Sequence, residues 1–327
     1  MSKFIGRLAN IGIAKEDVRG TPVDATFWLA KVALTLDDKI TQAIDGASTG
    51  VIEDSNDANV TEKFSEGTIE GMIRAEDFGL LLLSTLGAVV SNVDTPEAGV
   101  QTHDFTVLET AQHPSLTFSI DEPNAEKRHA LGMITSLDIA VALNEYASFT
   151  AGIRAQLGVV SSLTPAYVEA DQRKIFLPQH GTFKTAADLA GLGAAPAIEI
   201  KGFNLSISKN VEDDQTIGSL SPTDILNKQF AVEGTVEIMY ENTDFIDELL
   251  ADTPKAMRLT LANTDITIGS SSNPTLEIDL ARVKFSEVTK PFPNDDLVVQ
   301  TISFKGHYDL SDAALIKVKL INETISY

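Results

Sequence analysis

Apolar and polar residues alternate along several well-separated segments of the chain. The clearest alternating segments are residues 28–36, 198–207, 257–268 and 298–308. A period of two residues is typical of half-buried antiparallel strands, because successive side chains point to opposite faces of a sheet. The pattern therefore predicts a mainly β (α+β) fold with a few helices.

One strand-to-helix pattern occurs twice. EGTIEGMIRAEDFGLLLL (66–83) and EGTVEIMYENTDFIDELL (233–250) are identical at nine of eighteen ungapped positions. In each copy an alternating segment leads to Asp-Phe, and apolar residues then recur at helical spacing. The aspartate is a suitable N-cap. The residues predicted to anchor the two helices on the sheets are Phe78, Leu82, Phe245 and Leu249.

Weaker similarities extend the repeat in the same order. They pair 33–40 with 204–211, 113–118 with 273–278, and 147–152 with 301–306. Alternation alone could produce such strand similarity, but it would not place the same Asp-Phe transition in both copies. We therefore expect two homologous antiparallel sandwich or barrel domains, each with a flanking helix. The expected divisions are a first domain with an N-terminal arm at 1–165, a linker at 166–196 with one short helix near 185–190, and a second domain at 197–327.

Composition narrows the function classes. The 327 residues carry a formal net charge of −22, which disfavours tight binding to nucleic acid phosphates. There is no cysteine, so disulfides and thiolate metal sites are excluded. No apolar run is long enough to cross a bilayer, and the N-terminus lacks the features of a signal peptide. We expect no membrane association.

No catalytic, cofactor or metal site is expected. GASTG (46–50) fits the nucleophile pattern around Ser48, but a polar loop follows it instead of a helix. The five histidines do not have metal-ligand spacing. DSNDAN (54–59) lacks the glycine and the terminal glutamate of a calcium loop. The chain is therefore expected to be a structural or interaction protein, not an enzyme.

Several segments resemble the major tail tube proteins of long-tailed (siphovirus-type) bacteriophages. The opening IGIAKEDVRGTPVDATFWLAKV (11–32) is similar to the family's arm, in which a Glu and a Gly-Thr precede the first strand. Here these residues are Glu16, Gly20 and Thr21. The repeated strand–helix segment and residues 176–210 are also similar to the family, so the resemblance covers most of the chain.

The resemblance implies a virion protein, made in the cytoplasm of the host bacterium, that polymerises into stacked rings around a lumen. DNA passes through this lumen at infection without specific binding, and no cofactor is required. The implied partners are other copies of the chain, a tape measure protein and a tail terminator. With two repeated units per chain, the ring is expected to be a trimer acting as a pseudo-hexamer, or else a hexamer.

Two further expectations concern surfaces. Glu66, Glu70, Glu233 and Glu237 share one strand face with the same spacing in both copies, which fits either an acidic lumen wall or ordinary solubility. The N-terminal arm (1–21) and the polar loop 45–59 are expected to contact neighbouring rings. Two alternatives remain: another self-assembling structural protein, such as a pilus-like or capsid or tail decoration protein, and a carbohydrate-binding β-sandwich.

Overall fold

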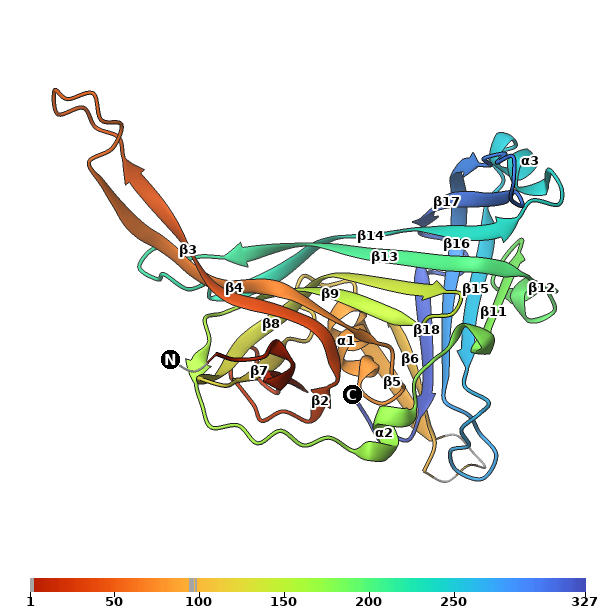
Figure 1. The fold of residues 1–327 in the computed structure, drawn as a ribbon, viewed down its shortest axis with the longest axis horizontal. Helices are drawn as coiled ribbons and strands as arrows, with labels where there is room; N and C mark the ends of the chain where they lie inside the picture. Colours follow the sequence, from red (N-terminus) through yellow and green to blue (C-terminus); the bar gives the residue numbers. More distant parts are fainter. Residues whose placement is uncertain (1–2, 94–96, 98) are drawn as a thin grey trace.

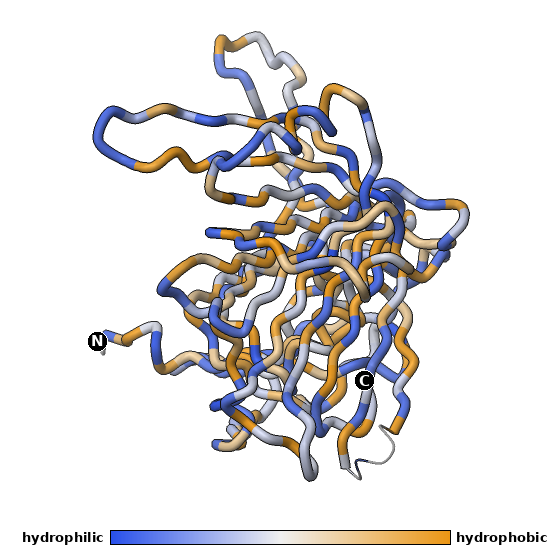
Figure 2. The backbone as a smooth tube through the Cα atoms, turned by 90° about the vertical axis from the view of Figure 1, so that its right-hand side faces the viewer, coloured by the Kyte–Doolittle hydropathy of each residue, from blue (hydrophilic) through white to orange (hydrophobic). Residues whose placement is uncertain are grey.

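The computed structural model describes residues 3–93, 97 and 99–327. The chain forms a β-rich body from which one long hairpin projects (Figure 1). Along the strands, hydrophobic and hydrophilic residues alternate (Figure 2). The mainly β fold predicted from the sequence is confirmed.

The elements follow one another along the whole chain. The strands are β1 (Asn10–Lys15), β2 (Phe27–Leu29), β3 (Lys31–Asp45), β4 (Asp57–Met72), β5 (Gly87–Val93), β6 (Gln101–Val107), β7 (Leu116–Glu122), β8 (Ala125–Ala142), β9 (Ser148–Ala155), β10 (Val159–Val160), β11 (Gly181–Ala186), β12 (Ala197–Ile198), β13 (Ile200–Asp214), β14 (Asp224–Met239), β15 (Lys255–Ala262), β16 (Thr275–Thr289), β17 (Val299–His307) and β18 (Ile316–Asn322). The helices are α1 (Phe78–Leu86), α2 (Glu169–Arg173) and α3 (Asp244–Leu250), with 3-10 turns η1 (Gly6–Leu8), η2 (Pro178–His180) and η3 (Ala190–Gly193).

Eight strands form one long antiparallel sheet in the order β3–β4–β9–β8–β13–β14–β17–β16. The first four strands come from the N-terminal half of the chain and the last four from the C-terminal half. The two halves have the same strand order, and they join where β8 pairs with β13.

A second layer of strands lies under each half because β8 and β16 each continue out of the long sheet. The first part of β8 pairs with β7 and β10, and β7 pairs with β1. The first part of β16 pairs with β15 and β18, and β15 pairs with β11. The β5–β6 hairpin of the first half then pairs with β18 of the second half. This hairpin forms a second connection between the halves.

The same irregularities occur in both halves. Register shifts between Lys31/Ala33, Thr41/Gln42, Leu116/Phe118 and Ile134/Ser136 in the first half have counterparts between Ile200/Gly202, Asn210/Val211, Lys255/Met257 and Phe285/Glu287 in the second. A β-bulge is a local insertion that simple alternation does not encode. Four bulges at corresponding ladder positions support the prediction of two homologous domains.

The ladders correct the weaker sequence matches. Leu36 and Leu205 lie opposite the equivalent glycines Gly67 and Gly234, so the match of 33–40 with 204–211 is two residues out of register. By the same criterion the match of 147–152 with 301–306 is three residues out, and an alignment of Phe149 with Phe304 is four out, because Ile153 is the residue equivalent to Phe304. The match of 113–118 with 273–278 is wrong, because β7 corresponds to β15 by its pairing. A period of two is unchanged by an even shift, so alternation alone cannot fix the register.

The segment 166–196 contains a strand that the sequence did not predict. The short helix expected near 185–190 is wrong: β11 occupies Gly181–Ala186 and pairs with β15 as β1 pairs with β7. Part of the expected linker thus belongs to the second half's sheet. The domain boundaries stay a prediction.

The two helices differ in burial. Every residue of α1 is buried between the sheets, and Phe78 packs against Phe149 with ring centroids 5.5 Å apart. In α3 no residue is buried; Phe245 and Leu249 are half-buried, and Phe245 packs on Phe285 at 5.7 Å. The β5–β6 hairpin and the C-terminal Tyr327 cover α1. No helix in the described ranges could span a membrane.

Candidate functional site: a polar sheet face with two free edges

One face of the long sheet is polar across all eight strands. Pairing places these residues on it: Thr35, Asp37, Lys39, Glu66, Thr68, Glu70, Thr150, Gly152, Arg154, Ser136, Asp138, Ala140, Asn204, Ser206, Ser208, Glu233, Thr235, Glu237, Thr301, Ser303, Lys305, Glu287 and Thr289. Seven are carboxylates and three are basic. A hollow of about 490 Å³ crosses the middle of this face from β9 to β17. The polar face is therefore concave where the two halves meet.

The four glutamates singled out in the sequence all lie on this polar face. Ile69 and Val236, on the opposite face, are buried, which confirms the strand alternation. Glu66 is 3.1 Å from Lys39 and 3.8 Å from Arg154, and Glu233 is 2.6 Å from Lys305.

Glu70 and Glu237 have no ion-pair partner within the described ranges. Sequence reasoning missed the basic partners Lys39, Arg154 and Lys305, because they lie on strands other than those of the glutamates they pair with. These basic residues reduce the net negative charge of the face. Of the four repeated glutamates, Glu66 and Glu233 are paired, so Glu70 and Glu237 carry the negative charge that is not compensated.

The long sheet has two edges that lack a partner strand in the described chain. At the junction inside the chain, Gly202–Ser208 of β13 pairs with Ser136–Ala142 of β8. The corresponding edges at the ends of the sheet are β3 and the last part of β16. Apolar side chains are exposed along or just beyond them: on β3, Val32 is 64% exposed and Ile40 53%, and in the segment that follows β16, Phe292 is 66% exposed. Open strand edges favour pairing with another chain.

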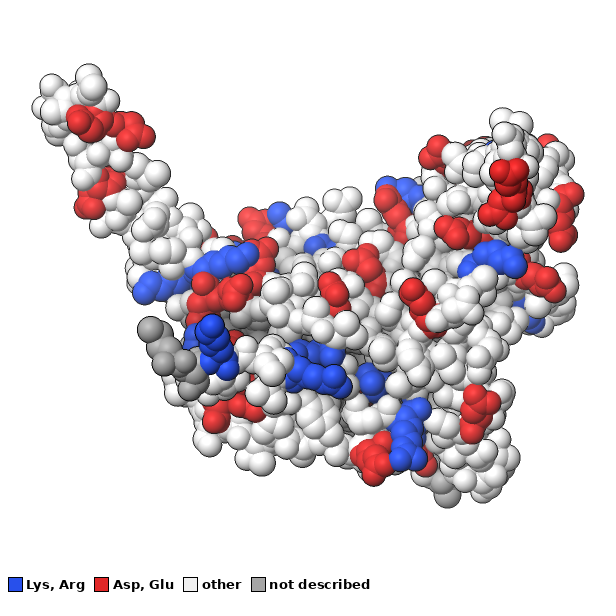
Figure 3. Space-filling model, in the orientation of Figure 1, with Lys and Arg blue, Asp and Glu red and all other residues white. Residues whose placement is uncertain are grey.

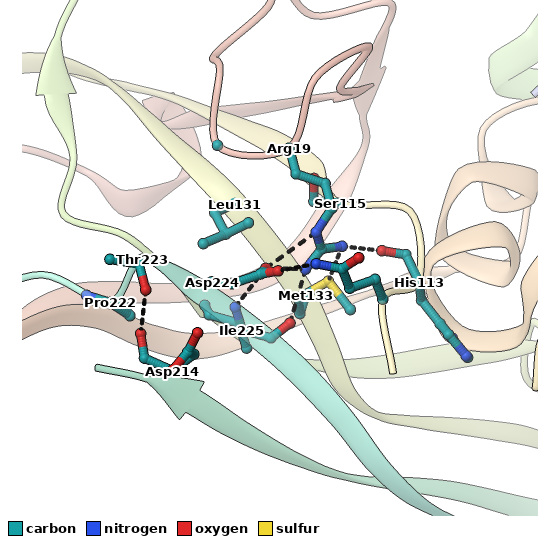
Figure 4. Close-up of polar contacts among 12 residues, drawn as sticks. Arg19, His113, Ser115, Leu131, Met133, Asp214, Pro222, Thr223, Asp224 and Ile225 are labelled. Atoms are coloured by element: carbon teal, nitrogen blue, oxygen red, sulfur yellow. Dashed lines mark hydrogen bonds and ion pairs between the residues drawn. The ribbon is translucent and has the colours of Figure 1, made fainter. Parts of the chain in front are cut away.

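The β13–β14 hairpin lies across the first half and is held there by polar contacts (Figure 4). Arg19 forms an ion pair with Asp224 and donates hydrogen bonds to the carbonyl oxygens of His113 and of Ile225, the latter at 2.9 Å. Gln112 also donates to Asp224 at 2.6 Å. Burial alone would raise the pKa of Asp224, but the Arg19 and Gln112 hydrogen bonds outweigh it and lower that pKa. By contrast, the β3–β4 hairpin projects from the body (Figure 1).

Carboxylates gather on two protruding parts of the surface (Figure 3). One is the β3–β4 tip, with Asp45, Glu53, Asp54 and Asp57, and the other surrounds α3. The tip also exposes Val51 and Ile52, the latter fully. The loop expected at 45–59 is thus the exposed end of a long hairpin.

The comparison with known protein families decides the identity. The sequence model of the family described as "Phage tail tube protein" matches residues 6–306, which is most of the chain. The chain belongs to the phage tail tube protein family. It is a structural tail tube component that assembles with itself, and it belongs to the virion tail.

Other comparisons add little to this identification of a tail tube protein. Among solved structures, one titled "Crystal structure of Hcp protein" is 12% identical and covers 42% of this chain and 96% of its own, with a TM-score of 0.22. That likeness is too low to support any inference. No curated protein matches the sequence.

The arm of this tail tube protein is mostly packed on its own domain. Glu16 is buried and accepts hydrogen bonds from the backbone of Gly20 at 2.7 Å and of Leu131 at 2.8 Å, and from the hydroxyls of Ser115 and Thr117. Gly20 has a φ of +76°, which favours glycine. The expectation that the whole arm 1–21 is free to contact other rings is therefore wrong, because most of β1 and the Glu16 side chain are buried in their own domain. Among the described residues of the arm, Lys3–Leu8 form the longest continuous exposed stretch.

The serine and histidines that were considered as catalytic or metal-binding residues lie at an exposed loop or in hydrogen bonds inside the fold. Ser48 lies at the exposed hairpin tip. His103 contacts Ser91 at 2.7 Å and Asn322 at 3.0 Å, and His129 contacts Ser65 at 3.0 Å. In the part of the chain that the structure describes, no three His, Asp or Glu residues form a metal-binding group.

Two buried basic side chains, Lys209 and His113, meet where the β13–β14 hairpin packs on the first half. Lys209 of β13 donates to the Ser84 carbonyl oxygen at 2.6 Å and lies 3.2 Å from Nδ1 of His113. Burial, with a smaller contribution from Lys209, lowers the pKa of His113 to about 4. Burial, assisted by Arg19, lowers the pKa of Lys209 to about 7. The site therefore favours a neutral imidazole at neutral pH.

This burial predicts an acid sensitivity that depends on His113. Its folded pKa lies below the ordinary value of 6.5, so the unfolded state binds the proton more readily and stability is lost as pH falls from 6.5 toward 4. The free energy of unfolding of the parent, relative to that of His113→Gln, should fall by up to about 1.4 kcal/mol per pH unit in this range. Urea denaturation at several pH values measures the difference.

The comparison with His113→Gln is needed because other groups titrate nearby. Burial raises the pKa of Asp77 to about 7, so its contribution has the opposite sign in the same range. Asp77 is present in both proteins and its effect cancels in the difference. Parallel pH profiles for parent and variant would contradict the assignment to His113.

Proposed function

We propose that three chains form each ring of the tail tube, so that six repeated units surround the lumen. The observation that carries this proposal is the β8–β13 pairing, in which the two halves of one chain join edge to edge. The two outer strands of the long sheet, β3 and β16, are the counterparts of the strands β13 and β8 that pair at this internal junction. Repeating the internal junction between chains leaves no free edge once the ring closes.

The matched bulges support one register for the proposed junction between chains. In the internal junction Asp138 lies opposite Ser206, and Val141 lies opposite Phe203. In the proposed junction, the equivalent positions are Thr289 of one chain opposite Asp37 of the next, and Phe292 opposite Leu34. Both internal apolar residues are buried, whereas Phe292 is 66% exposed in the single chain. Ring closure would bury this apolar pair.

The concave polar face is proposed to line the lumen through which the genome passes. Its Ser, Thr and Asn side chains give DNA little apolar surface to bind. The excess of carboxylates over basic residues repels phosphates, and the cross-strand ion pairs limit repulsion between neighbouring chains. The protein would thus act as a structural conduit and not as an enzyme, with a tape measure protein and a tail terminator as its other partners.

The double variant Glu70→Lys, Glu237→Lys tests the lumen assignment. These residues lack ion-pair partners, so the change should leave tubes intact but make the wall attract DNA. DNA ejection from assembled phage should slow, most strongly at low salt, since screening reaches about 10 Å at 0.1 M. Time-resolved DNA release measures the effect. The control changes the exposed Glu109 and Glu122 to Lys, and equal slowing in both variants would refute the assignment.

The carbohydrate-binding alternative receives no support from the sole tryptophan. Trp28 is buried, with 7% of its surface exposed, so its ring is not available to stack on a sugar. Its position in β2, packed on the arm, explains its presence without a ligand.

A further inference from the structure

The segment before β11 fills a space in the first half of the chain. Phe176 is fully buried there. Its backbone N–H donates to the Ile73 carbonyl oxygen at 3.2 Å, and its carbonyl oxygen accepts from the N–H of Ala147 at 3.0 Å. Beside it, Ile175 forms an antiparallel bridge with Arg74. A segment leading into the second half thus seals the end of the first half's β4–β9 ladder.

The segment before β1 is built in the same way as this one. β1 pairs with β7 as β11 pairs with β15, and a 3-10 turn precedes each strand: η1 before β1 and η2 before β11. Each turn is closed by equivalent hydrogen bonds, Leu8 N–H to Ile5 O at 3.0 Å and His180 N–H to Leu177 O at 2.9 Å. Counted back from these turns, Phe4 corresponds to Phe176 and Lys3 to Ile175.

The first segment has no such space to fill in its own chain. Phe4 is 50% exposed, Ile5 70% and Leu8 62%, whereas Phe176 is fully buried. The N-terminus lies at the opposite end of the molecule from α3 (Figure 1). The N-terminal segment therefore cannot reach the α3 end of the second half in the chain to which it belongs.

The counterpart space in the second half is open. A cleft of about 890 Å³ lies beside α3 and is lined in part by Met239, Glu241, Asn242, Phe245 and Gln300.

The ladder next to this cleft matches its counterpart in the first half. Tyr240 N–H donates to Val298 O at 3.0 Å, as Ile73 N–H donates to Ala147 O at 2.8 Å. Within the described ranges, however, the Tyr240 carbonyl oxygen and the Val298 N–H have no backbone partner like Phe176.

The charge of the cleft is opposite to that of the N-terminal segment. The residue equivalent to Arg74, which bridges Ile175, is Glu241 in the second half. The residue equivalent to Ile175 is Lys3 in the N-terminal segment. A second copy docked in the same way would place the Lys3 ammonium group beside the Glu241 carboxylate, with further acids at Glu199 and Glu248 in the cleft lining.

We propose that Lys3–Leu8 of one chain inserts into the cleft beside α3 of the neighbouring chain, with Phe4 in the position that Phe176 has inside the chain. The proposal rests on the ring described above. It assigns this segment to contacts between chains of one ring, and it explains why α3 lacks a cover in the single chain. The backbone of Phe4 would pair with Tyr240 and Val298 of the neighbour.

A disulfide trap tests this contact directly because the protein has no cysteine. Residues in an antiparallel bridge have Cα atoms about 4.5–5.5 Å apart, which a disulfide spans. Assembled Lys3→Cys, Glu241→Cys protein, oxidised and run on a non-reducing gel, should shift from the single-chain band to two- and three-chain bands. Lys3→Cys alone, and Lys3→Cys with Glu109→Cys, should stay at the single-chain position.

The outcomes separate this contact from the ring itself. Tubes that form normally with no covalent oligomer above the controls would overturn the docking and leave the ring proposal standing. A parent protein that stays monomeric would instead count against the ring. As a second readout, Lys3→Glu should reduce tube formation and Glu241→Lys should restore it in the double variant. Tubes of normal yield with Lys3→Glu alone would also overturn the docking.

Discussion

The variant Phe292→Asp is expected to fold as a stable monomer that no longer forms tubes. Phe292 is 66% exposed and packs edge-on against Tyr240, with ring centroids 6.1 Å apart, so its replacement removes only this aromatic contact and little other packing within the chain. Its counterpart Val141 is buried at the internal junction opposite Phe203. In the proposed ring, Phe292 meets Leu34 of the next chain, and an aspartate there would place an unpaired carboxylate in a desolvated contact. Such burial costs several kcal/mol at each junction.

Leu297→Asp is the matched control for this expectation. Leu297 is 71% exposed and lies in the same β16–β17 connection, but outside the proposed junction. Sedimentation velocity and negative-stain images should show tubes for the parent and for Leu297→Asp, and monomers for Phe292→Asp. Normal tubes from Phe292→Asp would contradict the proposed register.

Truncation of Phe78 is expected to destabilise the chain far more than truncation of its counterpart. Phe78 is fully buried between the sheets and contacts Phe149, so Phe78→Ala should cost about 3–5 kcal/mol. Phe245 is half-buried on Phe285, so Phe245→Ala should still lower stability, but by less. Denaturant unfolding of the unassembled protein measures both.

Leu250→Ala provides the control for helix α3, because Leu250 is 78% exposed and contributes little packing. Equal losses for Phe78→Ala and Phe245→Ala would show that the two helices are equally packed. A Phe245→Ala protein as stable as the parent would refute its role as a helix anchor.

The sequence predicts the repeated strand–helix element well because two kinds of information coincide there. Alternation marks the strand, and the Asp-Phe step followed by helical spacing marks where the strand ends. Both Phe78 and Phe245 lie in helices at that point, as expected. Outside this element only alternation was available, and the matches were displaced by two to four residues for that reason.

The ion-pair partners of a strand residue could not be predicted from the sequence of that strand alone. The ion pairs of Glu66 with Lys39 and Arg154 join three strands that are distant in sequence. The different burial of α1 and α3 likewise depends on the β5–β6 hairpin and Tyr327, which approach α1 only after folding. A signal for β11 was present, because GTFKTA alternates, but the surrounding glycines and prolines favoured a linker.

A cryo-electron microscopy reconstruction of assembled tubes tests the ring most directly. It should show three chains per ring, six repeated units around the lumen, and β3 of each chain paired with β16 of the next. Glu70 and Glu237 should face the lumen. Six chains per ring, or a map with these glutamates on the outer surface of the tube, would contradict the proposed arrangement.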